Sequence, residues 1–184
     1  MRWPIFAMFA FVAVVAQLSV RNAMTLYSVL GISPDVVMPL AVFIALFAQR
    51  TSALWGCMIL GLLMDLAPRE HAEPYHLLGI HALGYAAAGY MVLQMRTMVF
   101  RRRSVTVGFL TFLGLLVASL VAVMLLAIRS WYPGAEAYGP LSDLGRRFLI
   151  ALYSGVVAVP VGWLLGLTVP LWGFQSNAPR RGGW

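Results

Sequence analysis

The sequence predicts an all-α integral membrane protein, a compact bundle of six transmembrane helices. It is 61% hydrophobic and only 10% charged, whereas a soluble domain is about half apolar and a quarter charged. The mean hydropathy is +0.85. About 20 apolar residues cross roughly 30 Å of hydrocarbon, so 184 residues hold five to seven crossings, roughly, and no separate soluble domain. We expect one transmembrane domain at 1–174 and a short polar cytoplasmic tail at 175–184.

Apolar runs between helix-breaking residues define the six expected spans. They are 3–19, 34–48, 51–67, 77–95, 105–128 and 148–172. A secretory signal, with a cleavage-like Val14-Val15-Ala16, is a less favoured interpretation of the first run, because only Arg2 precedes it as a basic residue.

The second and third runs predict a tight helical hairpin. Only Gln49 and Arg50 separate them, and a continuous helix would be about 51 Å long with an arginine at its centre. Ser33-Pro34-Asp35 opens the hairpin with an N-cap candidate, a proline at the first helical position and a carboxylate in the first turn.

Small residues recur at helical spacing in the fourth and sixth runs. Close approach of helices in lipid depends on such residues, because hydrophobicity does not drive association there. The two stripes therefore predict packing faces, either inside the bundle or against a partner helix. The residues are Gly79, Ala82, Ala86 and Gly89, followed by Gly155, Ala158, Gly162 and Gly166.

The charged residues predict a multi-pass membrane protein with both termini in the cytoplasm. With six crossings, eight of the 13 arginines and no acidic residue lie on the cytoplasmic side, and the other five arginines and all six acids lie outside. A cluster at 101–103 before the fifth run leads this asymmetry. The net charge of +7 is thus explained by topology, and no nucleic acid is expected as a partner.

Ionisable residues at similar depth form a candidate polar layer near the outer face. Asp35 and Asp65 each lie fifteen residues from Arg50 in the hairpin turn, or about 22 Å along a helix. Arg69 follows Asp65 by four residues, and His81 begins the fourth run at a similar height. An ionisable group at membrane depth is a functional candidate. The alternative is a helix-end ion pair at the interface.

No catalytic residue, cofactor or metal site is expected. His71, His76 and His81 are spaced by five residues, so successive side chains point about 140° apart on a helix and do not converge on one ion. Cys57 is the single cysteine and lies in an apolar run. The nucleophile, metalloprotease and phosphate-loop motifs are missing.

An ordered set of short motifs occupies the middle third of the chain, about 34–96. They are Pro34-Asp35, Gly56, Gly61, Leu62-Leu63-Met64-Asp65-Leu66, Leu78-Gly79-Ile80-His81-Ala82-Leu83-Gly84-Tyr85 and Gly89-Tyr90. With these motifs the chain resembles the bacterial rod shape-determining protein MreD family. This resemblance implies a non-enzymatic scaffold or regulator, in the bacterial inner membrane, of the complex that synthesises peptidoglycan during cell elongation. It also implies a fold similar to the substrate-binding subunits of energy-coupling-factor transporters. The implied partners are MreC, the synthase formed by RodA and its transpeptidase, the MreB filament and membrane lipid.

A second class of function stays open, namely a small-molecule (vitamin-type) substrate-binding subunit of a membrane transporter. Such a subunit needs a cavity on which polar groups converge. The sequence offers only the outer polar layer for this purpose. The link at 67–78 is longer than is usual in the resembled family.

Overall fold

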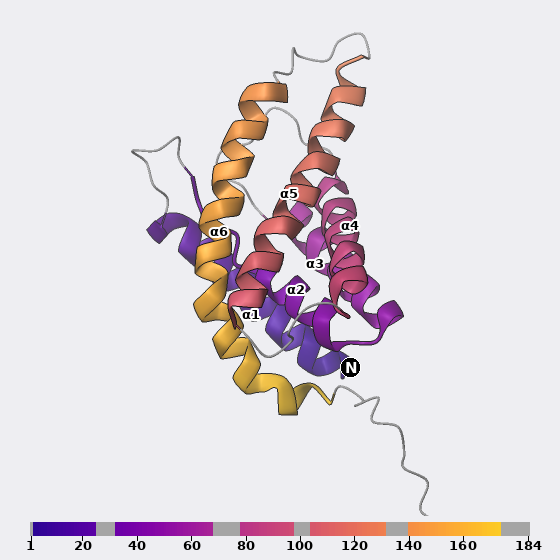
Figure 1. Cartoon of the computed structure of the whole chain (residues 1–184), viewed down its shortest axis with the longest axis vertical. Coiled ribbons are helices and arrows are strands. Elements are labelled where there is room, and N and C mark those ends of the chain that lie inside the picture. Colours follow the sequence, from indigo (N-terminus) through magenta and orange to yellow (C-terminus); the bar gives the residue numbers. More distant parts are fainter. Residues whose placement is uncertain (1, 25–31, 68–77, 98–103, 132–139, 174–184) are drawn as a thin grey trace, which may run out of the picture.

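The computed structural model describes residues 2–24, 32–67, 78–97, 104–131 and 140–173, and the regular elements in these ranges are helices (Figure 1). Six α-helices and a final 3₁₀ helix, η1, confirm the all-helical prediction. Their bounds lie within a few residues of the predicted runs, except that the last helix begins eight residues earlier. The elements are α1 (Trp3–Met24), α2 (Val37–Phe47), α3 (Arg50–Leu66), α4 (Ile80–Met95), α5 (Ser104–Arg129), α6 (Pro140–Thr168) and η1 (Val169–Trp172).

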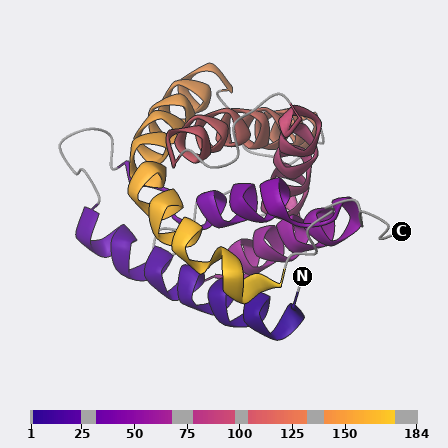
Figure 2. The same ribbon diagram turned by 60° about the horizontal axis from the view of Figure 1, so that its bottom comes forward.

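The short helix α2 occupies the centre of the molecule. Ten consecutive residues, from Val37 to Leu46, are buried. Figure 2 shows α2 surrounded by the other helices, and it packs against each of the other α-helices. A helix that is apolar all round is stable only when it is covered on every side. The composition of α2 therefore explains its position.

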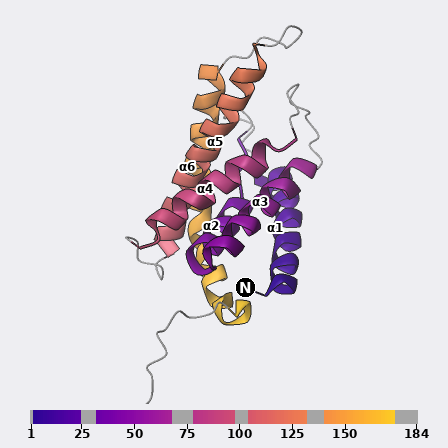
Figure 3. The same ribbon diagram turned by 90° about the vertical axis from the view of Figure 1, so that its right-hand side faces the viewer.

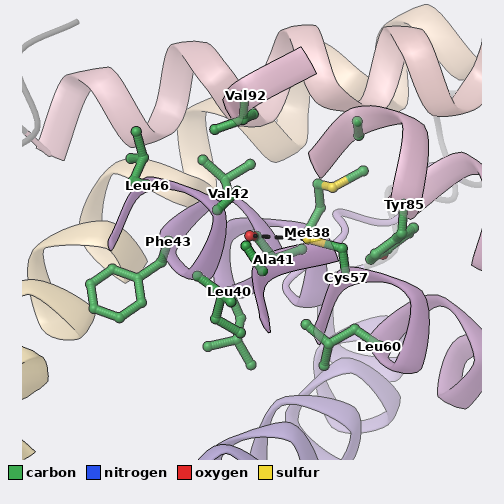
Figure 4. Close-up of a cluster of buried hydrophobic side chains, with 14 of the residues drawn as sticks. Met38, Leu40, Ala41, Val42, Phe43, Leu46, Cys57, Leu60, Tyr85 and Val92 are labelled. Carbon is green, nitrogen blue, oxygen red and sulfur yellow. Dashed lines mark hydrogen bonds between the residues drawn. The ribbon is translucent and has the colours of Figure 1, made fainter. Parts of the chain in front are cut away.

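The core around α2 takes buried side chains from all five other α-helices, α3 and α4 among them. Figure 4 shows Met38 and Val42 of α2 among Cys57 of α3 and Val92 of α4. The Cys57 thiol lies 3.6 Å from the carbonyl oxygen of Ala41. Cys57 thus has a packing position between two helices.

Helix lengths limit how many full membrane crossings the structure supports. Within the described ranges, three segments are long and apolar enough to cross a membrane: Trp3–Val20, Ser104–Arg129 and Asp143–Trp172. The 11 residues of α2 reach only about 16 Å, and α3 and α4 reach about 25 and 24 Å. The chain is a membrane protein, while crossing by α2, α3 and α4 stays a prediction.

Charged residues cap both ends of the short central helix α2. At its beginning the Asp35 carboxylate accepts hydrogen bonds from the N–H groups of Val37 and Met38. At its end the Arg96 guanidinium donates a 3.1 Å hydrogen bond to the carbonyl of Ala48. A negative charge at the amino end and a positive charge at the carboxyl end both complement the helix dipole.

Helices α5 and α6 form a long antiparallel pair that extends beyond the other helices (Figures 1 and 3). The two backbones are close: a Cβ atom on Gly108 would lie 2.7 Å from the carbonyl oxygen of Gly155. The sequence prediction missed the first eight residues of α6 because several of them are polar. Asp143 and Arg147 form a 2.6 Å ion pair one turn apart, so the helix continues outward past the apolar run.

The two ends of the described chain lie together. The N–H of Arg2 donates a 3.2 Å hydrogen bond to the carbonyl of Trp172. The Trp172 side chain is fully buried, and its ring lies 4.9 Å from that of Phe9 and 5.6 Å from that of Phe43. In Figure 1 the N-terminus accordingly lies near the end of α6.

Candidate functional site

The Asp65 carboxylate, near the end of α3, binds the first turn of α4. Its Oδ2 accepts hydrogen bonds from the N–H groups of Gly79 (3.0 Å) and Ala82 (3.1 Å). Its Oδ1 accepts one from the N–H of His81 (3.2 Å) and lies 2.8 Å from His81 Nδ1. The Asp65 side chain is 3% exposed and that of His81 27%. A carboxylate from one helix therefore caps the amino end of the next, where unpaired N–H groups and the helix dipole favour an anion.

Two glycines make this contact between helices possible. Gly61 lies one turn before Asp65 on α3, and a Cβ atom there would lie 2.4 Å from the carbonyl oxygen of His81. Gly79 precedes α4 with a φ of +102°, which favours glycine because it is a left-handed conformation. The absence of a side chain at Gly61 lets the α4 backbone approach, and the conformation of Gly79 turns its N–H toward Asp65.

Asp35 forms a second connection at the start of α2. Its Oδ1 accepts hydrogen bonds of 2.9 Å from the N–H groups of Val37 and Met38, and its Oδ2 accepts one of 2.6 Å from the Tyr85 hydroxyl of α4. Its own N–H donates to Ser154 Oγ of α6 over 2.8 Å. Asp35 thereby connects α2, α4 and α6.

Gln17 attaches α1 to the same point. Its amide nitrogen donates a 3.0 Å hydrogen bond to the carbonyl of Pro34, and its amide oxygen accepts a 2.6 Å bond from the N–H of Val36. Gln17 is buried within an apolar helix. An uncharged polar residue inside a membrane helix tends to bond to its neighbours, and that signal could have marked Gln17. Ser154 carried the same signal.

The structure brings three of the four residues of the predicted polar layer together through α4. His81 contacts Asp65, and Tyr85, one turn further along α4, contacts Asp35. The two aspartates thus bind successive turns of one helix. Arg69, the predicted partner of Asp65, lies outside the described residues, as do His71 and His76. Tyr85 was missed as a site residue because a tyrosine in an apolar run is usually part of the core.

Two of the four residues of the predicted small-residue stripe on α4, Ala82 and Gly89, face α3. Ala82 is buried against Gly61, and a Cβ atom on Gly89 would lie 2.6 Å from Cys57 Sγ. Ala86 is half-buried. The assignment of Gly79 to this helical face is wrong, because its positive φ places it before the helix, and a Cβ atom there would meet nothing within 4 Å.

The stripe on α6 faces α5 over most of its length. A Cβ atom on Gly155 would lie 3.0 Å from the Phe112 side chain, and one on Gly162 would lie 2.8 Å from Val107. Ala158 is fully buried. Gly166 does not pack inside the bundle, since a Cβ atom there would meet nothing within 4 Å, and its use as a partner face stays a prediction. Gly162 already lies beside Val107, near the start of α5, so the next turn of α6 passes the end of its neighbour.

Comparison with known proteins places the chain in a family. The model of the family described as rod shape-determining protein MreD matches residues 1–135. The chain belongs to the MreD family. The matched residues contain α1 to α5 and with them both aspartates, whereas Ser154 lies on α6 beyond the match. No curated protein and no solved structure matches the chain.

Membership of the MreD family assigns the protein to the determination of rod shape. This family consists of shape-determining structural proteins and is not a known enzyme family. The fold expected from the MreD resemblance, that of energy-coupling-factor substrate-binding subunits, stays a prediction.

Proposed function

We propose that this chain is a non-enzymatic scaffold or regulator in the inner membrane that binds MreC and the synthase formed by RodA and its transpeptidase, and through them acts with the MreB filament. The observation that carries the proposal is that the aspartates of the polar layer bond to the protein's own helices. Each of the four carboxylate oxygens of Asp35 and Asp65 accepts at least one hydrogen bond from the chain itself. These groups hold helices in place, as a rigid binding partner requires.

The same observation argues against a solute-binding subunit. A binding site for a small polar molecule needs polar groups that converge on a cavity. The described polar residues of the outer layer instead point at helix ends and at neighbouring side chains. Occupying them with a solute would break several internal hydrogen bonds at once. The transporter function is therefore the second candidate.

The proposed topology has both termini in the cytoplasm. The hydrogen bond from Arg2 to Trp172 supports this topology, because two segments in contact at the end of a bundle lie on one side of the membrane. The hydrogen bond from Arg96 to Ala48 joins the α2–α3 turn to the end of α4. In the proposal these ends lie with the cytoplasmic arginines, and the Asp65 cap lies toward the outside.

The test is co-purification in a strain whose chromosomal copy has been deleted. The tagged full-length chain restores rod shape and retains MreC and the synthase after solubilisation in a mild detergent. Asp143→Asn serves as the matched control for a substitution in the polar layer such as Asp65→Asn, because it changes a carboxylate outside that layer. Retention of an energising ATPase with no MreC or synthase would instead support the transporter function.

A further inference from the structure

A basic and aromatic surface lies where the start of α3 meets the second half of α4. The guanidinium carbon of Arg50 lies 5.7 Å from the centre of the Tyr90 ring. The Tyr90 hydroxyl accepts a 2.9 Å hydrogen bond from the Gln94 side chain. All three residues are exposed. Tyr90 thus holds the Arg50 side chain over α4 at the surface of the bundle.

This arrangement leaves Arg50 suited to a phosphate group. A guanidinium that lies over an aromatic ring still carries its N–H donors in its own plane, and they match two oxygens of a phosphate. The neighbouring Gln94 and Tyr90 add polar atoms at the same surface. None of the six acidic residues of the sequence is close along the chain: Asp35 and Asp65 each lie fifteen residues away. Arg50 therefore supplies a positive charge to this surface.

An apolar strip continues from this surface along the same two helices. It consists of the exposed Met58 and Leu62 on α3 and Leu83 on α4. Gly61 contacts His81 and Ala82, and Gly89 contacts Cys57, so the two helices pack side by side along this strip. From Arg50 to Leu62 the helix rises about 18 Å, which is close to the roughly 15 Å of one leaflet of hydrocarbon.

We propose that Arg50, Tyr90 and Gln94 bind the headgroup phosphate of an anionic phospholipid whose acyl chain lies along Met58, Leu62 and Leu83. Charge complementarity selects the lipid, since a positive surface without a nearby acid favours a headgroup with net negative charge over a zwitterionic one. In the proposed topology this lipid belongs to the cytoplasmic leaflet. Ala82 and Gly89 of the predicted stripe on α4 face α3, so the lipid occupies a different face of that helix.

The experiment measures lipid binding to the purified full-length chain in detergent by native mass spectrometry. Phosphatidylglycerol and phosphatidylcholine with identical acyl chains are titrated separately, and inorganic phosphate is added as a competitor. The wild-type chain binds phosphatidylglycerol more tightly than phosphatidylcholine. Arg50→Gln weakens phosphatidylglycerol binding roughly fivefold, the effect of one arginine near a membrane surface, and Tyr90→Leu weakens it in the same direction while keeping the charge.

Arg2→Gln is the matched control, because it removes one arginine from the same end of the bundle but not from the α3–α4 surface. It leaves binding unchanged. Equal losses of phosphatidylglycerol binding for Arg50→Gln and Arg2→Gln would show that a general effect of charge, and not a site on α3 and α4, accounts for the binding. Equal binding of the two lipids, or full displacement by inorganic phosphate at the lipid's own concentration, would overturn the lipid assignment. Helix content measured without lipid checks that each variant is folded. If Arg50→Gln is not folded, the lipid binding of Tyr90→Leu decides whether the site exists.

Discussion

The Tyr85 hydroxyl donates a 2.6 Å hydrogen bond to Asp35 Oδ2, across fifty residues of sequence. Tyr85 is 1% exposed, and Asp35 caps the start of the buried helix α2. This hydrogen bond therefore joins the start of the central helix to α4. The backbone N–H of the same aspartate donates to Ser154 Oγ of α6, so α2, α4 and α6 meet at this one residue.

Replacing Tyr85 by phenylalanine is expected to destabilise the protein. The change removes a hydrogen bond to a charged group, which is worth about 1.5–3 kcal/mol, and leaves the packing of the ring unchanged. Thermal unfolding in detergent measures the loss. Tyr90→Phe is the matched control, because it removes a hydroxyl from an exposed tyrosine of the same helix, where changes of about 0.5 kcal/mol or less are usual. Equal midpoints for Tyr85→Phe and Tyr90→Phe would contradict the proposed connection.

Two glycine substitutions are expected to have different effects on thermal stability. Gly61→Ala places a methyl group 2.4 Å from the carbonyl oxygen of His81, so α3 and α4 must separate, at a cost of about 1–3 kcal/mol. Gly166→Ala adds the same methyl group where nothing lies within 4 Å, and alanine is better than glycine inside a helix by roughly 0.5–1 kcal/mol. The unfolding midpoint should fall for the first variant and stay or rise for the second. A destabilised Gly166→Ala would show that this face of α6 is covered.

The membrane topology is expected to follow the arginines. Reporter fusions after Arg103 and after Ser176 should both be cytoplasmic, and a fusion after Gly134 should be periplasmic. The contact between Arg2 and Trp172 supports an even number of crossings, and the arginine asymmetry gives their direction. A periplasmic reporter at Ser176 would refute the arrangement with six crossings.

The sequence predicted the helices well because apolar runs and breakers are local features. It failed at residues 140–147, where α6 continues through polar residues that include the ion pair between Asp143 and Arg147. It also failed to show that the short helix α2 is central, because burial on every side depends on the other five α-helices. The equal spacing of Asp35 and Asp65 from Arg50 predicted that the two aspartates lie at one level of the bundle. Tyr85 and Ser154, which bond to Asp35, and Gln17, which bonds to Pro34 and Val36, were missed because contacts across 17 to 119 residues arise only from tertiary packing.

Asp65→Asn tests whether the cap on α4 matters for function. Asparagine keeps the shape of the side chain but replaces one acceptor oxygen by a donor, so at least one N–H group among Gly79, His81 and Ala82 loses its partner. The cost is about 1–3 kcal/mol, and insertion should survive because the helix loses a charge. If the geometry of α4 positions a partner protein, complex assembly and cell elongation weaken. The measurement is complementation of a deletion strain, with membrane abundance determined in parallel. Asp143→Asn is the control, since it breaks an ion pair within one helix that is worth about 0–1 kcal/mol. Loss of rod shape at normal abundance would retain Asp65 as a functional residue, and full complementation at normal abundance would discard it.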